Sequence, residues 1–239
     1  MRATLSEFRH RWWVIFSIFT VAFLAYFIDP KNAGGSLAEV LASWLGAKPT
    51  ANFYRLVFAF GTLLVFLAAC VRTWGTSYLN AEVMRDSRVH TERLLADGPY
   101  RFVRNPLYLG NILLAAGIGL MASRIGFFVL TLGMTVFVTR LILREEAELL
   151  RDQGEPYRRY CDAVPRLVPS IAPRVPSAGN TPDWGQGYRA EMLYWLMTLW
   201  IAAITVTLNT KVSWGLFALA LVASWVRKRP RTKQGAETT

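Results

Sequence analysis

The chain has 239 residues, of which 53% are hydrophobic and 13% aromatic, and it carries a formal net charge of +11. Its uninterrupted apolar runs exclude a soluble domain and indicate a polytopic membrane protein whose length suits a single bundle. The positive charge does not indicate a nucleic-acid partner, because the basic residues cluster in short segments between the apolar runs. That distribution is typical of membrane topology and of contact with anionic lipid headgroups.

Cysteine and histidine are scarce. The two cysteines, Cys70 and Cys161, cannot form a disulfide framework, and we expect both to be unpaired. The two histidines, His10 and His90, are too few for a metal site of the usual kind. We therefore predict no metal.

The first half of the chain predicts two spans. The apolar run from Trp12 to Ile28 is long enough to cross a bilayer and lacks the small-residue cleavage site of a secretory signal, so we expect it to stay attached. A capping-box pattern at Ser36 predicts a short interfacial helix as far as Leu45. The second span is predicted from Phe53 to Val71. The polar segment from Arg72 to Arg104, with its six arginines, is expected to be cytoplasmic.

A tight helical hairpin is predicted next. Two apolar runs, Leu107 to Ala122 and Ile125 to Leu143, are joined only by Ser123-Arg124. The second helix should continue to Asp152 and end at Gly154, where glycine tolerates the backbone angles of a helix end.

The remainder predicts a cytoplasmic cover and two further spans. Tyr157 and Tyr160 should lie on a short helix, followed by an extended proline-rich strap between Pro165 and Pro176. Spans are predicted at 192–208 and 212–226. The sequence thus predicts an all-α fold, a polytopic transmembrane bundle of about six spans in one domain over residues 1–239. We expect it to lie in the inner (plasma) membrane with both termini in the cytoplasm.

One polar stretch, from Gly98 to Gly110, concentrates charge where the chain enters the membrane. Gly98-Pro99 breaks any arriving helix, and Asn105-Pro106 starts a new one. The hairpin should bring Arg104-Asn105 to the same membrane surface as Glu145-Glu146. Such charge also anchors helix ends, but this concentration is costly unless it binds something, and a helix start suits a carboxylate or phosphate.

These residues carry a resemblance to a known group. The stretch Gly98–Gly110, followed by Glu145-Glu146, Gly154, Tyr157, Tyr160 and Pro165-Arg166, resembles the integral-membrane methyltransferases. This group comprises the isoprenylcysteine carboxyl methyltransferases and the phospholipid N-methyltransferases. The resemblance covers about residues 94–169. It departs at Asn105, where many relatives carry histidine, and at Gln153, where an aromatic residue is usual; the first departure disfavours an acid–base role at that position.

The resemblance implies S-adenosylmethionine as the cofactor and a lipophilic or amphipathic methyl acceptor at the cytoplasmic face. The cofactor-binding residues it implies are Tyr100, Arg101, Arg104, Asn105, Pro106, Tyr108, Leu109, Gly110, Glu145 and Glu146. Either arginine, with the helix start, would hold the cofactor carboxylate. A glutamate would meet its ammonium or ribose, and we favour Glu146 over Glu145. The expected catalytic residues are Glu146, Arg144 and Tyr108.

The acceptor stays open at this stage. A prenylcysteine-type carboxylate needs no base, whereas a lipid amine or a thiol must lose a proton, for which Glu146, Tyr108 and His90 are candidates. Arg144 and the basic strap suit an anionic headgroup. Two other interpretations are an NADPH-dependent reductase of the membrane sterol type, although those chains are usually longer, and a non-enzymatic lipid-binding protein.

Overall fold

The structure is an elongated bundle of helices. The computed structural model describes residues 2–83, 97–209, 211–216 and 218–219. The long elements of the described part are α2 (Arg11–Leu24), α4 (Ala51–Val83), α5 (Pro106–Gly119), α6 (Arg124–Gln153) and α9 (Met192–Thr207). Shorter helices are α1 (Leu5–Arg9), η1 (Ala25–Phe27), α3 (Ala33–Trp44), η2 (Gly98–Arg101), α7 (Glu155–Ala163) and α8 (Trp184–Ala190). The described residues form no strands, which agrees with the predicted all-α class.

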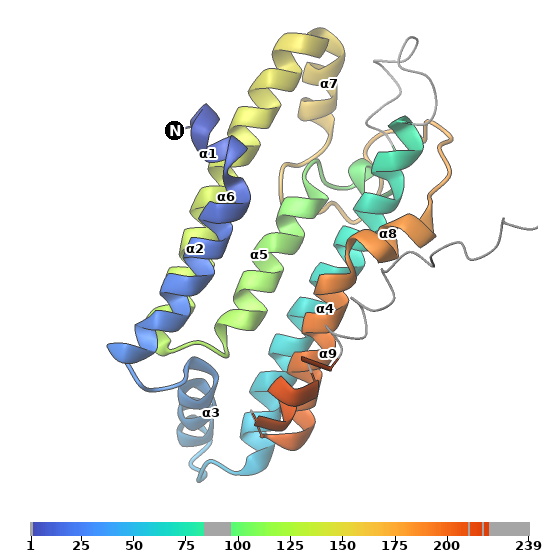
Figure 1. Ribbon diagram of the computed structural model, residues 1–239. Coiled ribbons are helices and arrows are strands. Elements are labelled where there is room, and N and C mark those ends of the chain that lie inside the picture. The colour runs from blue at the N-terminus through green and yellow to red at the C-terminus, as the bar shows by residue number, and fades with distance from the viewer. Residues whose placement is uncertain (1, 84–96, 210, 217, 220–239) are drawn as a thin grey trace, which may run out of the picture.

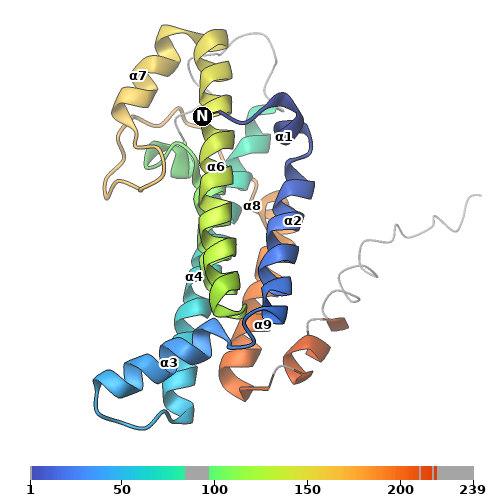
Figure 2. The same ribbon diagram turned by 90° about the vertical axis from the view of Figure 1, so that its left-hand side faces the viewer.

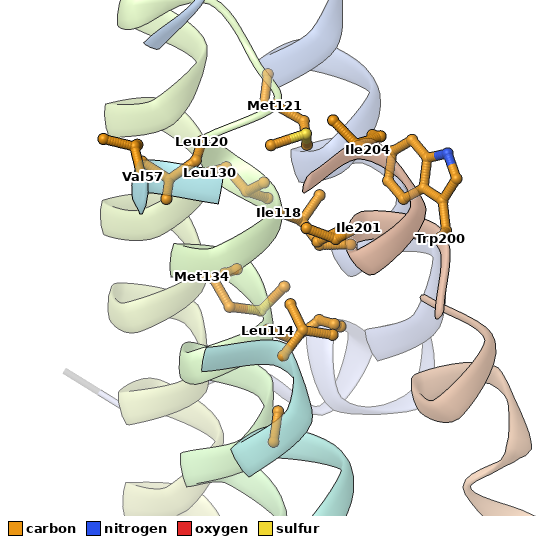
Figure 3. Close-up of a cluster of buried hydrophobic side chains, with 14 of the residues drawn as sticks. Val57, Leu114, Ile118, Leu120, Met121, Leu130, Met134, Trp200, Ile201 and Ile204 are labelled. Carbon is orange, nitrogen blue, oxygen red and sulfur yellow. The ribbon is translucent and has the colours of Figure 1, made fainter. Parts of the chain in front are cut away.

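The helix α5 lies at the centre of the bundle. It packs on one side against α4, which also contacts α9, and on the other side against α6, which also contacts α2 (Figure 1). At one end of the bundle α6 extends past α5 and is followed by α7 (Figure 1), while α3 lies at the opposite end (Figure 2). Apolar side chains from α5, α6 and α9 fill the middle, among them Leu114, Ile118, Met134 and Ile201 (Figure 3).

Fewer helices reach spanning length than the sequence predicts. Within the described part, residues 51–79 of α4 and the whole of α6 are long and apolar enough to cross a membrane. The pair α8 and α9, bent by 63°, counts as a third if it forms one span. At 1.5 Å per residue α5 is only about 21 Å long, and the apolar segment Arg11–Phe27 is also short. The predicted last span, 212–226, lies largely outside the described residues.

Several predicted helix boundaries are confirmed. The helix α5 begins at Pro106 with Asn105 in the N-cap position. The helix α6 begins at Arg124, one residue before the predicted apolar run, and Ser123 caps it by accepting a hydrogen bond from the backbone N–H of Gly126 at 3.0 Å. Gly154 ends α6 with a φ of +64°, and α7 follows at once. Residues 164–183 contain no helix, as the prolines predict.

Two predicted boundaries are wrong. The helix α3 is capped not by Ser36 but by Asn32, whose side chain accepts from the N–H of Gly35 and donates to the carbonyls of Leu120 and Ala122. Contacts with the hairpin turn therefore override the local capping pattern. The helix α4 does not end at Val71 but continues to Val83, so that Arg72 lies buried inside the bundle rather than in a polar connection.

Candidate functional site

A cavity of about 460 Å³ lies at the end of the bundle where α5 begins. Side chains from α2, α4, η2, α5, α6 and α7 line it. Seven of the ten cofactor-binding residues expected from the sequence are among them: Tyr100, Arg104, Asn105, Pro106, Tyr108, Glu145 and Glu146. The hairpin thus brings the predicted polar groups of both its arms to one concave surface.

Glu146 is the centre of a buried group of hydrogen bonds and ion pairs. Its side chain is 10% exposed and accepts hydrogen bonds from Asn105 at 3.2 Å and from Arg166 at 3.0 Å. Arg104, which is equally buried, completes an ion pair with it at 3.3 Å. Asn105 also donates to the carbonyl of Arg166 at 3.2 Å. This carboxylate therefore joins α6 to the start of α5 and to the strap.

Glu145 has a different environment. The hydroxyl of Tyr108 donates to its carboxylate at 2.6 Å. Among the described residues, the ion pairs of this region go to Glu146 and Glu148 rather than to Glu145. Although the two glutamates are adjacent on α6, both border the cavity. Glu145 is consequently a cavity carboxylate without an ion pair to any described residue.

Four of the residues expected to act in the site do not line the cavity. Arg101 donates from Nε to the carbonyl of Val175 at 2.9 Å and so holds the strap. Arg144 pairs with Glu148 at 2.8 Å and donates to the carbonyl of Ala3. Leu109 lies on another face of α5.

Gly110, the fourth of these residues, permits the close approach of two helices. A Cβ atom on it would lie 2.4 Å from Cγ of Arg72, which belongs to α4. The absence of a side chain at this position therefore lets the arginine pass between the helices toward the cavity.

The strap is fastened over the segment that precedes α5. The backbone N–H of Arg104 donates to the carbonyl of Pro165 at 2.9 Å, and that of Ser170 donates to the carbonyl of Phe102 at 2.9 Å. Tyr160 on α7 adds a hydrogen bond from its hydroxyl to the carbonyl of Tyr100 at 2.9 Å. These contacts hold α7 and the strap against the cavity end of the bundle.

Asp97 anchors the other end of the strap. It is 3% exposed and accepts hydrogen bonds from the hydroxyl of Ser177 and from the backbone N–H groups of Ala178 and Asn180. Burial by itself raises the pKa of Asp97, but these donors outweigh burial, and the net pKa lies below its ordinary value. The carboxylate is therefore ionised under neutral conditions.

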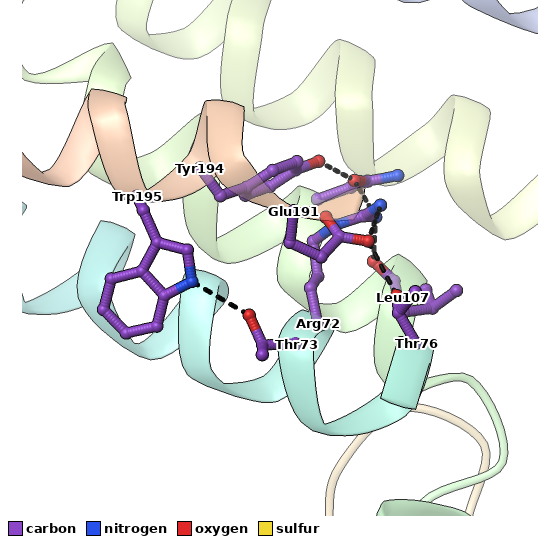
Figure 4. A network of polar contacts seen from close by, with 8 residues as sticks. Arg72, Thr73, Thr76, Leu107, Glu191, Tyr194 and Trp195 are labelled. Atoms are coloured by element: carbon purple, nitrogen blue, oxygen red, sulfur yellow. Dashed lines mark hydrogen bonds and ion pairs between the residues drawn. The ribbon is translucent and has the colours of Figure 1, made fainter. Parts of the chain in front are cut away.

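A buried polar network, absent from the sequence predictions, borders the cavity from the α4 side (Figure 4). Arg72 forms a bidentate ion pair with Glu191, with Nε and Nη2 at 2.6 and 3.0 Å from the carboxylate oxygens. Its Nη1 donates to the carbonyl of Leu107 and to Asn111. Thr76 donates a further hydrogen bond to Glu191 at 2.7 Å.

Only part of this network left a signal in the sequence. An arginine at the end of an apolar run and an amide three residues after Tyr108 are unusual inside a membrane bundle, where buried polar groups are costly. The sequence does not show that they meet. From α2, outside the recognised motif, Arg11, Trp12 and Ile15 also line the cavity.

Comparison with known proteins gives one family. Residues 56–153 match the phospholipid methyltransferase family, a segment that includes most of α4 and all of η2, α5 and α6. The match confirms the resemblance to the integral-membrane methyltransferases, and the long apolar helices agree with a membrane protein. No curated protein and no solved structure matches significantly. The described residues contain no cluster of three or more potential metal ligands.

Proposed function

We propose that this protein transfers the methyl group of S-adenosylmethionine to the amine of an amphipathic lipid, with the cofactor bound in the cavity beside the start of α5. The observation that carries the proposal is the lining of this cavity. It combines a carboxylate without an ion pair, a helix start, an arginine and several tyrosines within or beside the segment that matches the phospholipid methyltransferases.

The side chains present suit the chemical groups of the cofactor. A volume of 460 Å³ is in the range of small-molecule sites, which is about 300–1,000 Å³. The Nε of Arg104 is buried without a hydrogen-bond partner, and the first turn of α5 lies beside it, so both suit the cofactor carboxylate. Glu145 suits the ammonium group, and Tyr100 and Tyr157 supply aromatic surface for the adenine.

When bound, the cofactor supplies an activated methyl group, and the protein has to align the acceptor and exclude water. The strap and α7 cover the cavity end and serve the second purpose. A lipid ammonium must lose a proton before it can act as a nucleophile. Glu145 is engaged by the cofactor ammonium and by the hydroxyl of Tyr108, and Glu146 is occupied by Arg104, Arg166 and Asn105, so the amine has to enter the site in its deprotonated form.

The orientation in the membrane is part of the proposal. The cavity end of the bundle carries Arg9 and Arg11 on the N-terminal helices and the basic strap, a distribution typical of a cytoplasmic surface. The soluble cofactor would enter from the cytoplasm. The lipid would enter from the bilayer beside α2, whose Trp12 and Trp13 are 66% and 70% exposed. We also propose that the protein lies in the inner (plasma) membrane, that both termini are cytoplasmic, and that residues 1–239 form a single domain.

The test is calorimetric titration of the detergent-purified protein with S-adenosylmethionine, with its demethylated product and with NADPH. We expect the first two to bind and Glu145→Gln to weaken both by about tenfold or more, as loss of a charge-assisted contact predicts. The control is Glu148→Gln, which removes a carboxylate one turn away that is paired with Arg144 outside the cavity. It should leave the affinity unchanged.

Other outcomes point to other functions. Binding of NADPH alone would identify a reductase, and binding of none of the three compounds would favour a non-enzymatic lipid-binding protein. A second assay separates the acceptors: the protein, with labelled cofactor, is presented with vesicles that contain either a phospholipid amine or a prenylcysteine carboxylate. Transfer of label to the phospholipid amine is the expected result.

A further inference from the structure

The amide of Asn111 has a fixed orientation. Its Oδ1 accepts one hydrogen bond from Nη1 of Arg72 at 2.8 Å and another from the hydroxyl of Tyr194. A guanidinium can only donate, so the amide oxygen and not the nitrogen must face it. The Nδ2 group, on the other branch of the amide, is therefore directed away from Arg72.

This Nδ2 group lacks a partner within the described part of the chain. No hydrogen bond of it to protein is present, although Asn111 is only 9% exposed and lines the cavity. The Nδ2 atom itself is open to the cavity and not fully buried, so it needs a partner from water or from a ligand. A bound molecule in the cavity supplies one, because the nitrogen can donate to an oxygen or nitrogen atom of that molecule.

We infer that Asn111 is a ligand-binding residue that donates a hydrogen bond from Nδ2 to an acceptor atom of the molecule held in the cavity, an inference that rests on the proposed function. Asn111 lies three residues after Tyr108 on the same face of α5, about 4.5 Å further along the helix axis. The acceptor atom therefore lies deeper in the bundle than the pair formed by Tyr108 and Glu145. It belongs either to the nucleoside part of the cofactor or to the polar head of the lipid.

The network around Arg72 positions this donor. Glu191 holds the guanidinium in a bidentate pair, and the ring of Tyr194 stacks on it with Cζ 4.3 Å from the ring centroid (Figure 4). Both Glu191 and Tyr194 are outside the segment 56–153 that matches the family. Glu191 immediately precedes α9, and Tyr194 lies in its first turn. The region at the start of α9 therefore contributes to the site by orienting Asn111.

The decisive variant is Asn111→Asp. An aspartate keeps an oxygen for Arg72 and Tyr194 but replaces the donor with a second acceptor, so the network is retained while the contact with the ligand becomes repulsive. We expect about a tenfold or greater rise either in the dissociation constant of the demethylated cofactor or in the KM of a vesicle-borne phospholipid amine. The first result assigns the contact to the nucleoside and the second to the lipid head. A second variant, Asn111→Ser, should give the same loss without adding charge.

The control removes a hydrogen bond between α4 and α9 that lies away from the cavity. The indole N–H of Trp195 on α9 donates to the hydroxyl of Thr73 on α4 at 3.0 Å. We expect Thr73→Val to lower the melting temperature without changing either binding constant. If Glu191 acts by positioning Asn111, Glu191→Gln should weaken binding, and adding Asn111→Asp to it should cause little further weakening. The two substitutions should differ in their effects on stability.

Two outcomes would overturn the inference. If the parent protein binds the demethylated cofactor, and a folded Asn111→Asp variant retains both parental constants, Asn111 does not contact the ligand, while the proposed function stands. If the parent protein binds neither cofactor form, the proposed function fails, and this inference fails with it.

Discussion

Replacing Glu146 with alanine tests the assignment of different roles to two adjacent glutamates. The substitution leaves Arg104 buried, with a side chain only 10% exposed, and removes its carboxylate partner. It also removes one of the two acceptors of Asn105. Breaking a buried ion pair by removing one partner costs about 3–5 kcal/mol, because the remaining charge stays in a poorly solvated place. We expect a loss of that size in the free energy of unfolding.

Two variants provide the comparison. Arg166 also binds Glu146, but its side chain is 44% exposed, so Arg166→Ala should cost only about 1 kcal/mol, as exposed ion pairs do. Glu145→Ala, one residue away, should change stability little, because the group that it leaves behind is the neutral hydroxyl of Tyr108. It should nevertheless abolish most of the affinity for the cofactor.

The assay is unfolding by denaturant of the detergent-solubilised variants, combined with calorimetric binding at a temperature where all are folded. The expected pattern is a large stability loss for Glu146→Ala and a large affinity loss for Glu145→Ala. If Glu146→Ala were as stable as the parent protein and lost only cofactor binding, the reasoning from its occupied oxygens would be refuted. The direct cofactor contact would then belong to Glu146.

Three further predictions concern single positions. The pKa of Asp97 is lowered in the native state, so the stability that this carboxylate contributes is complete above its ordinary pKa near 3.8 and is lost as the pH falls through the lower native value. Cleavage within residues 164–183 by an acid protease should increase at that low pH, and Asp97→Asn should allow cleavage at neutral pH. Gly110→Ala should destabilise the protein by about 1–3 kcal/mol, because the new Cβ would meet the fixed side chain of Arg72. The control is Gly133→Ala, which should melt near the parental temperature because its new Cβ would lie 3.3 Å from a methyl group of Ile18. Tyr108→Phe should lower methyl transfer about tenfold at nearly unchanged stability, as it removes the hydrogen bond to Glu145; a parental rate in the transfer assay would contradict that role.

Much of the fold can be predicted because helix boundaries depend on local chemistry. Pro106 has no N–H to donate and suits a first turn, Ser123 caps the following helix, and Gly154 adopts a positive φ at its end. The two-residue connection between the hairpin helices leaves their distant ends side by side. For that reason the meeting of Asn105 with Glu146 follows from spacing alone, and the structure confirms it.

Only the tertiary structure decides the contacts between segments that are far apart in sequence. Arg72 and Glu191 are separated by 119 positions, and no local pattern indicates that they form a pair. The same pair makes the arginine tolerable inside the bundle, where α4 continues past Val71. Which glutamate is paired with arginines is likewise decided by Arg104 and the strap, because neighbouring positions on a helix differ only in what lies opposite them.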